Sequence, residues 1–269
     1  MSELHEIAFT RDEVAEILRL CDGKALLVGG QALAFWAQRY EVEPPDVLIT
    51  HITRDADFLG GRDVARSMVR QLDGWDIYEP GFDDVTSQTA KLAKTVGLGV
   101  KQIDFMANIV GLDNSKISKR APVIELEDGT SLSILHPIDV LASRFHNLAS
   151  LPSKRTPEGI AQAQLAISVA REFLQDSRSV GTQKDMLGWV EDVIELAQNK
   201  RLEMVASKYN ISLLAAIPLQ AIESPEFHSR RWPQVLKYAE ERARLMEKRK
   251  ARAKSEPLDP DEPAETPAP

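Results

Sequence analysis

A Gly-Gly pair ends a short apolar run near the start of the chain, and two aspartates in an Asp-x-Asp pattern follow it. The apolar run is 25–28, the glycines are Gly29 and Gly30, and the acids are Asp55 and Asp57. In a β-strand successive side chains point to opposite faces, so Asp55 and Asp57 would share one face while apolar alternates pack on the other. The pattern therefore predicts a strand that presents a metal-binding pair of carboxylates.

A third aspartate lies in another predicted strand, residues 100–106. There Asp104 would share the polar face, and Ile103 and Phe105 would face the core. Three acids on two strands would hold one or two Mg²⁺ or Mn²⁺ ions against the phosphates of a nucleotide. A structural interpretation stays open, in which Asp104 pairs with Lys101 or with a neighbouring strand.

The glycine pair lies where the first strand meets a predicted helix, residues 31–40. Glycine lets a phosphate approach the backbone closely, and a helix N-terminus offers free N–H groups and a favourable dipole for anions. Gln31 would hydrogen-bond a phosphate through its side-chain amide or cap the helix, and Thr53 is a further candidate contact. The other interpretation of the glycines is an ordinary tight turn.

The segments 28–34 and 53–59 together resemble the nucleotidyltransferase superfamily, most closely its AbiEii-type and related minimal members from bacterial toxin-antitoxin and phage-defence systems. The resemblance covers roughly residues 20–150. It implies an α/β (α+β) fold with a mixed β-sheet flanked by helices. It also implies catalytic, metal-binding roles for Asp55, Asp57 and Asp104, and nucleotide-binding roles for Gly29, Gly30, Gln31, Thr53 and Arg144.

Two features depart from the pattern of these relatives. The connection between Gly30 and Asp55 has 24 residues, which is longer than in the compact members of the superfamily. The Lys after the third acid and the later Lys-Asp pair of AbiEii-type proteins are also missing. Arg144, Lys154 and Arg155 are the candidates to supply the cation.

The resemblance implies a Mg²⁺-dependent enzyme that transfers NMP from an NTP to a hydroxyl of RNA or protein, with tRNA as one expected acceptor and a cognate toxin or antitoxin as a partner. A non-catalytic, antitoxin-like binding module on the same fold is one alternative. A small-molecule nucleotidyltransferase of the aminoglycoside-modifying kind is another. A basic groove near Arg144 would favour RNA, whereas an acidic cleft would favour a small molecule.

Helical apolar spacing at residues 160–174 and 186–197 predicts that the second half of the chain is helical. We therefore expect a catalytic domain at 1–150, a helical domain at 151–254 and a disordered, acidic, Pro-rich tail at 255–269. The tail carries five acids and no base, and its five prolines and few apolar groups cannot offset the entropy of ordering.

The net charge of −8 is unevenly distributed. Residues 231–254 hold nine Lys or Arg against three Glu, a net +6, in a segment of good helix formers. This basic helix either contacts nucleic-acid phosphates or is a solvated surface helix. The chain has no apolar run of the 18 or more residues that a membrane span needs, no secretion signal at its start, and one cysteine. These features predict a cytoplasmic protein that does not associate with a membrane.

Overall fold

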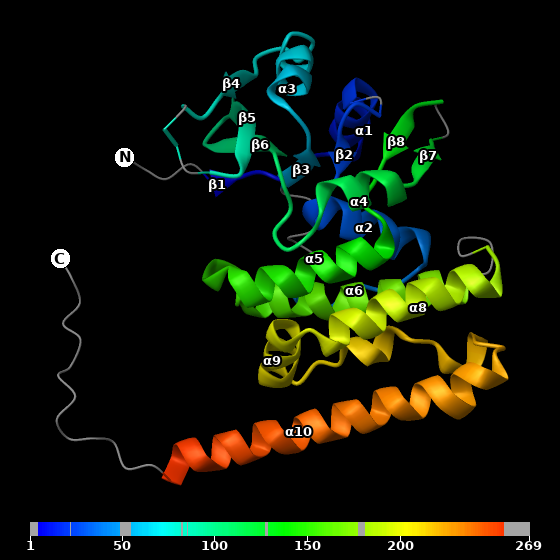
Figure 1. The fold of residues 1–269 in the computed structure, drawn as a ribbon. Helices are drawn as coiled ribbons and strands as arrows, with labels where there is room; N and C mark the ends of the chain where they lie inside the picture. The colour runs from blue at the N-terminus through cyan, green and yellow to red at the C-terminus, as the bar shows by residue number, and fades with distance from the viewer. Residues whose placement is uncertain are drawn as a thin grey trace. The chain divides into compact units, whose positions relative to one another are not determined.

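The computed structural model describes most of the chain and divides it into two compact units, Met1–Ile222 and Glu223–Pro269. The described residues are 5–21, 23–48, 55–81, 83–84, 86–126, 129–176 and 181–255. Strands occur in the N-terminal part and helices follow them, which confirms the predicted mixed α+β class (Figure 1). The functional boundary expected near residue 150 stays a prediction.

Six strands of the described residues form one mixed sheet in the order β2-β3-β6-β5-β4, with β1 paired to β6. The strands are β1 (His5–Glu6), β2 (Leu26–Leu27), β3 (Asp55–Leu59), β4 (Asp76–Tyr78), β5 (Gln88–Val96) and β6 (Gly99–Met106). Strand β6 runs parallel to β3 and β1, and the β2–β3, β5–β6 and β4–β5 pairs are antiparallel. Strands β7 (Val123–Glu125) and β8 (Ser131–Ser133) form a separate antiparallel pair, and residues 127 and 128 of its turn lie outside the described residues.

One face of this sheet is apolar and buried. Phe58 of β3 and Phe105 of β6 are 0% exposed, and their rings stack at 5.6 Å between centroids. Helix α1 (Arg11–Cys21) contacts α3 (Arg62–Val69), which contacts β5. Lys101, buried in β6, donates to Glu13 of α1 at 2.6 Å, so the one charged side chain on the buried face of β6 has an ionic partner.

The Thr-x-x-Glu sequence of residues 10–13 forms a capping box at the start of α1. The Thr10 backbone N–H donates to Glu13 Oε2 at 2.8 Å, and the Glu13 N–H donates to Thr10 Oγ1 at 3.3 Å. Helix α2 (Gly29–Arg39) differs from the prediction, because it begins at Gly29 and so includes both glycines in its first turn. Strand β5 pairs with β6 from Gln88 to Val96, where Val96 lies opposite Gly99.

The helices that follow the sheet pack on α2 and on one another (Figure 1). They are α4 (Asn114–Arg120), α5 (Pro137–Ser150), α6 (Pro157–Gln175), α8 (Gln183–Gln198) and α9 (Lys200–Tyr209), with short 3₁₀ turns η2 (Pro152–Lys154), η3 (Leu213–Ala216) and η4 (Leu219–Ala221). A further 3₁₀ turn, η1 (Asp46–Leu48), lies between α2 and β3. Trp36 of α2, which is 3% exposed, donates from Nε1 to the Leu135 carbonyl at 2.8 Å. That bond ties α2 to the chain just before α5.

The second unit contains the predicted basic helix. A π-helical turn, η5 (Phe227–Arg231), leads into α10 (Trp232–Ser255). Within this unit the Phe227 and Trp232 rings stack at 6.1 Å between centroids. The helix is confirmed, and its contact with nucleic acid stays a prediction. The expected tail lies outside the described residues from 256 onward.

None of the helices in the described part of the chain combines the length and the apolar character needed to cross a membrane.

His136 supplies a pH-dependent contribution to stability. It is 6% exposed, its Nδ1 accepts from the Ile138 N–H at the start of α5, and its ring stacks on Trp189 at 4.2 Å. Burial, with the charge of Arg120, lowers the pKa of His136 to about 3. The folded state therefore resists protonation, and the stabilisation present above pH 6.5 is lost as pH falls from 6.5 towards 3.

We expect His136→Asn, which keeps an N-cap acceptor, to be less stable than the wild type at pH 7. The difference in unfolding free energy should shrink by about 2 kcal/mol between pH 6.5 and 4.5, since one pKa unit corresponds to about 1.4 kcal/mol. Urea denaturation at several pH values measures this difference. Parallel stability curves for the two proteins would contradict it.

Candidate functional site

Asp57 and Asp104 are Cα partners on the parallel strands β3 and β6. Their neighbours Ala56, Phe58, Ile103 and Phe105 are buried, whereas both aspartates are only partly buried. Because neighbouring strands lie about 5 Å apart and paired residues share a face, the two carboxylates are side by side on the polar face of the sheet. Two of the three acids predicted from the sequence are thus brought together.

Asp55 is the first residue of β3 and pairs with Gln102 of β6. Its side chain lies outside the part that the structure describes, and so does Thr53. Their predicted roles in metal and nucleotide binding stay predictions.

The Gly-Gly pair contacts the Asp-x-Asp strand directly. Gly29 has φ +65°, a conformation that L side chains rarely adopt, and it is the first residue of α2. A Cβ placed on Gly29 would lie 1.9 Å from Asp57 Oδ2. The absent side chain at Gly29 therefore makes room for the Asp57 carboxylate at the N-terminus of α2, where the helix dipole favours negative charge.

Opposing effects set the charge state of Asp57. Burial raises the pKa of its carboxyl group, whereas the charges of Arg144 and Lys154 and a backbone hydrogen bond from Gly30 lower it. The net direction is upward, so the carboxylate is not fully compensated by its protein neighbours. An added cation would relieve this deficit.

Asp104 has partners on the neighbouring antiparallel strand. Gln88 of β5 donates from Nε2 to Asp104 Oδ1 at 2.6 Å, and Lys91 Nζ lies 3.9 Å from the same oxygen. Burial and the negative charges of Asp57 and Glu6 raise the Asp104 pKa, against the lowering by Lys91 and Gln88. The pairing with a neighbouring strand is thus observed, through Lys91 and not Lys101. It leaves Asp104 with a raised pKa, as befits a group that accepts protons.

Arg144 lies on α5 and interacts electrostatically with Asp57. It is 7% exposed, and its Nη1 donates to Gln162 Oε1 at 2.9 Å. Its Nε and the Nε2 of Gln31, which is 8% exposed, are buried donors with no hydrogen-bond partner among the described residues. Buried donors of this kind are costly unless an acceptor arrives. Both belong to residues that the sequence suggested as phosphate contacts.

The two other candidate cations have different roles. Arg155 donates from Nε to the Leu148 carbonyl and from Nη2 to the Ala149 carbonyl, both at 2.9 Å, so it caps the end of α5. Lys154, in η2, is exposed, and its positive charge lowers the pKa of Asp57. A Cβ on Gly159 would lie 1.9 Å from the Lys154 carbonyl oxygen, so Gly159 permits the close packing of this turn on α6.

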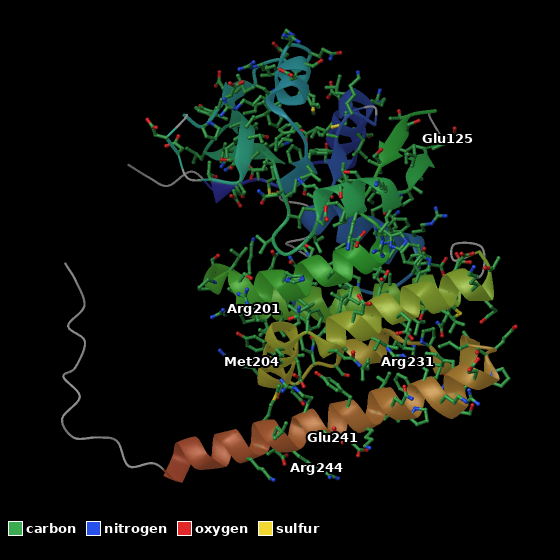
Figure 2. The ribbon with its side chains drawn as sticks, in the orientation of Figure 1. Glu125, Arg201, Met204, Arg231, Glu241 and Arg244 are labelled. Carbon is green, nitrogen blue, oxygen red and sulfur yellow. The ribbon has the colours of Figure 1, made fainter. Side chains whose placement is uncertain are left out.

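A basic pocket lies beside the same turn. It has a volume of about 230 Å³ and is lined by Arg155, by Arg201, Met204 and Lys208 of α9, and by no carboxylate. Arg201 and Met204 project from α9 in Figure 2, and Met204 is 62% exposed. Tyr209 adds an aromatic ring to the lining. Cations together with an aromatic ring are the side chains that bind the phosphates and bases of single-stranded nucleic acid.

Within the described residues no group of three His, Cys, Asp or Glu side chains is placed to hold a metal ion. The side chain of Asp55 lies outside the described residues and is therefore not one of these side chains. The predicted Mg²⁺ site stays a prediction. The chemistry of the donors fits a hard cation, because Asp57 and Asp104 are adjacent carboxylates whose pKa values are both raised. Sequence reasoning missed Glu6, whose two-residue strand has no recognisable pattern.

No protein-family model and no curated protein matches the sequence. Among solved structures, the polyadenylate synthase of Megavirus is similar over 70% of this chain, with 11% sequence identity and a TM-score of 0.36. The chain spans 36% of the length of that protein.

The contact between Gly29 and Asp57 can be tested with a matched pair of glycine variants. Gly97 has a similar positive φ of +59°, and a Cβ there would meet nothing within 4 Å. We expect Gly97→Ala to cost about 1–2 kcal/mol of unfolding free energy for the left-handed conformation alone. Gly29→Ala should cost clearly more, because it also displaces the Asp57 carboxylate. Urea denaturation of both variants measures this, and equal costs would contradict the contact.

Proposed function

We propose that this protein is a Mg²⁺-dependent nucleotidyltransferase that transfers NMP from an NTP to a hydroxyl acceptor and releases pyrophosphate. The observation that carries the proposal is the placement of Asp57 and Asp104 side by side, with the N-terminus of α2 against Asp57. Adjacent acids beside a helix N-terminus bring a metal-binding group and an anion-binding group to one place.

Each residue of the site has a proposed task. Asp57 and Asp104, with Asp55, would hold Mg²⁺, which when bound neutralises phosphate charge and orients the nucleotide. Arg144, Lys154 and the side-chain amide of Gln31 would bind phosphate oxygens, while the Gly30 N–H holds Asp57. The raised pKa of Asp104 suits it to take the proton of the acceptor hydroxyl.

RNA is the acceptor class that the surface supports best. Arg155, which lines the basic pocket together with Arg201 and Lys208, directly follows Lys154 in the chain. No carboxylate lines this pocket. Because the charge of Lys154 reaches Asp57, this positive pocket lies beside the proposed site and suits a polyanionic substrate. A tRNA acceptor, and a place in a bacterial toxin-antitoxin or defence system with a cognate partner, are proposed from the resemblance to AbiEii-type proteins.

A non-catalytic binding module is the second candidate, and one observation favours it. The Asp57 carboxylate already lies against Gly29 and interacts with Arg144, so the protein itself neutralises part of its negative charge. Such a protein would bind a nucleotide or a partner without transferring NMP.

The assay is transfer of label from each α-labelled NTP, with Mg²⁺ and total tRNA. We expect Asp57→Asn and Asp104→Asn each to lower the transfer rate by about 10²–10⁴-fold, the usual contribution of a positioned acid or base. Asp73→Asn, an exposed acid outside the site, is the control and should keep wild-type activity.

Absence of transfer with every NTP, together with absence of Mg²⁺-dependent NTP binding, would overturn the enzymatic proposal and support the binding module. Transfer that persists undiminished in Asp57→Asn would place the reaction at another site.

A further inference from the structure

A second cavity lies away from the proposed nucleotide site. It has a volume of about 320 Å³ and is lined by residues of α4, α5, α8 and the segment that precedes α4. On α5 its lining residues are Ile138, Asp139, Ala142 and His146, whereas Arg144 is not among them. None of the acids or cations assigned to nucleotide binding lines this cavity, and its volume is within the range of small-molecule sites.

Arg120 of α4 joins three elements in the wall of the cavity. Its Nη2 donates to Asp192 Oδ2 of α8 at 3.0 Å, and its Nε lies 3.5 Å from Asp139 Oδ2 of α5. The carbon of its guanidinium lies 4.5 Å from the centre of the Trp189 ring. These contacts engage Nη2 and one face of the guanidinium, whereas its Nε, like Asp139 Oδ2, makes no hydrogen bond among the described residues.

The negative charge of the buried Asp139 carboxylate is only partly compensated by Arg120. It is 5% exposed, and its Oδ2 has no hydrogen-bond partner among the described residues, since the geometry towards Arg120 does not make one. Burial and the charge of Asp192 raise the pKa of Asp139 to about 6, against the lowering by Arg120. A buried carboxylate with one poorly aligned partner is stabilised by any additional cation.

Over the whole lining carboxylates outnumber cations by four to two: Asp113, Asp139, Asp192 and Glu195 against Lys116 and Arg120. Asp113 is committed to α4, because its Oδ1 accepts from the Ser115 N–H at 2.8 Å. Burial lowers the pKa of His146, so this ring is neutral at pH 7. Glu195 is exposed and adds a carboxylate at the solvent side.

Apolar residues complete the walls of the cavity: Leu112, Ile117, Ile138, Ala142 and Leu196. A ligand that fits must therefore combine a positive hydrogen-bond donor with a hydrocarbon segment. An ammonium group on an alkyl chain has both properties.

We propose that this cavity binds the ammonium group of an aliphatic primary amine, held by Asp192 and Glu195 and compensating Asp139, with its alkyl chain against the apolar walls. This chemistry is shared by a free diamine and by a lysine side chain. The proposal is independent of the nucleotidyltransferase activity.

The test is calorimetric titration of the full chain at low ionic strength with 1,5-diaminopentane and, separately, with Nα-acetyl-lysine amide. The neutral 1-pentanol and an equal ionic strength of NaCl are the ligand controls. We expect saturable binding of one or both amines and of neither control. Binding of the diamine alone identifies a free amine as the ligand, and binding of the lysine amide identifies a side chain of a partner; either result supports the site.

Asp192→Asn and Glu195→Gln should each weaken the binding of the amine about tenfold, the effect of losing one charge-assisted hydrogen bond. Glu195 is exposed, so this variant tests the site without disturbing the interior. Asp73→Asn should bind as the wild type does. Circular dichroism checks that each variant is folded.

Affinity should also rise between pH 5 and pH 7 as Asp139 ionises. The charged groups that line the cavity with Asp139 are Arg120 and Lys116 of α4, Asp192 and Glu195 of α8 and Asp113 before α4, and His146, whose pKa burial lowers, lies on α5 itself. No binding of either amine, or binding unchanged in both acidic variants, would overturn the proposal.

Discussion

The close contact between Gly29 and Asp57 is the constraint on which the arrangement of the site depends. A carboxylate fits against the first turn of α2 because residue 29 has no side chain, and φ +65° there is available to glycine at little cost. The contact joins β3 to α2, and the backbone bond from the Val28 N–H to the Asp57 carbonyl, 2.9 Å long, reinforces it. The glycine pair and the Asp-x-Asp strand are therefore parts of one structural unit.

Electrostatics gives this unit its chemical character. Asp57, Asp104 and Glu6 place negative charge on one part of the sheet, and Arg144, Lys154 and Lys91 offset it incompletely, since the pKa values of both Asp57 and Asp104 are raised. Buried donors of Arg144 and Gln31 lack acceptors among the described residues. A site with uncompensated carboxylates and unused donors suits a ligand that carries both a cation and phosphate oxygens, as a metal-bound nucleotide does.

The sequence predicted the elements whose signals are local. The capping box at Thr10 and Glu13, the apolar alternation around Phe58 and Phe105 and the helical spacing after residue 150 all depend on neighbours in the chain. The sequence placed Asp57 and Asp104 on the polar faces of two strands, because alternation fixes which residues of one strand share a face, and the structure shows that these strands pair at the two aspartates. It missed α4, α9 and the two-residue strand β1, whose short or weakly apolar segments carry little periodic signal.

Long-range contacts were beyond the sequence. The sequence offered both Lys154 and Arg155 as the cation near Asp57. Arg155 instead donates hydrogen bonds to the Leu148 and Ala149 carbonyls at the end of α5, so the charge that reaches Asp57 is that of Lys154. The division of the Arg120 charge between Asp139 and Asp192 likewise requires three helices to be placed first. The sequence assigned Gly29 to a phosphate, and the structure adds that Asp57 is its immediate neighbour.

The most direct test of this account is the pKa of Asp57, measured by the ¹³C chemical shift of its carboxyl group and assigned by the loss of the signal in Asp57→Asn. Asp57 is expected to titrate above its ordinary pKa in the free protein, because burial outweighs Arg144, Lys154 and the Gly30 N–H. Mg²⁺ with NTP is expected to lower this pKa. A pKa at or below the ordinary value in the free protein, unchanged by Mg²⁺ and NTP, would contradict the claim that Asp57 is an incompletely compensated carboxylate that binds a metal-bound nucleotide.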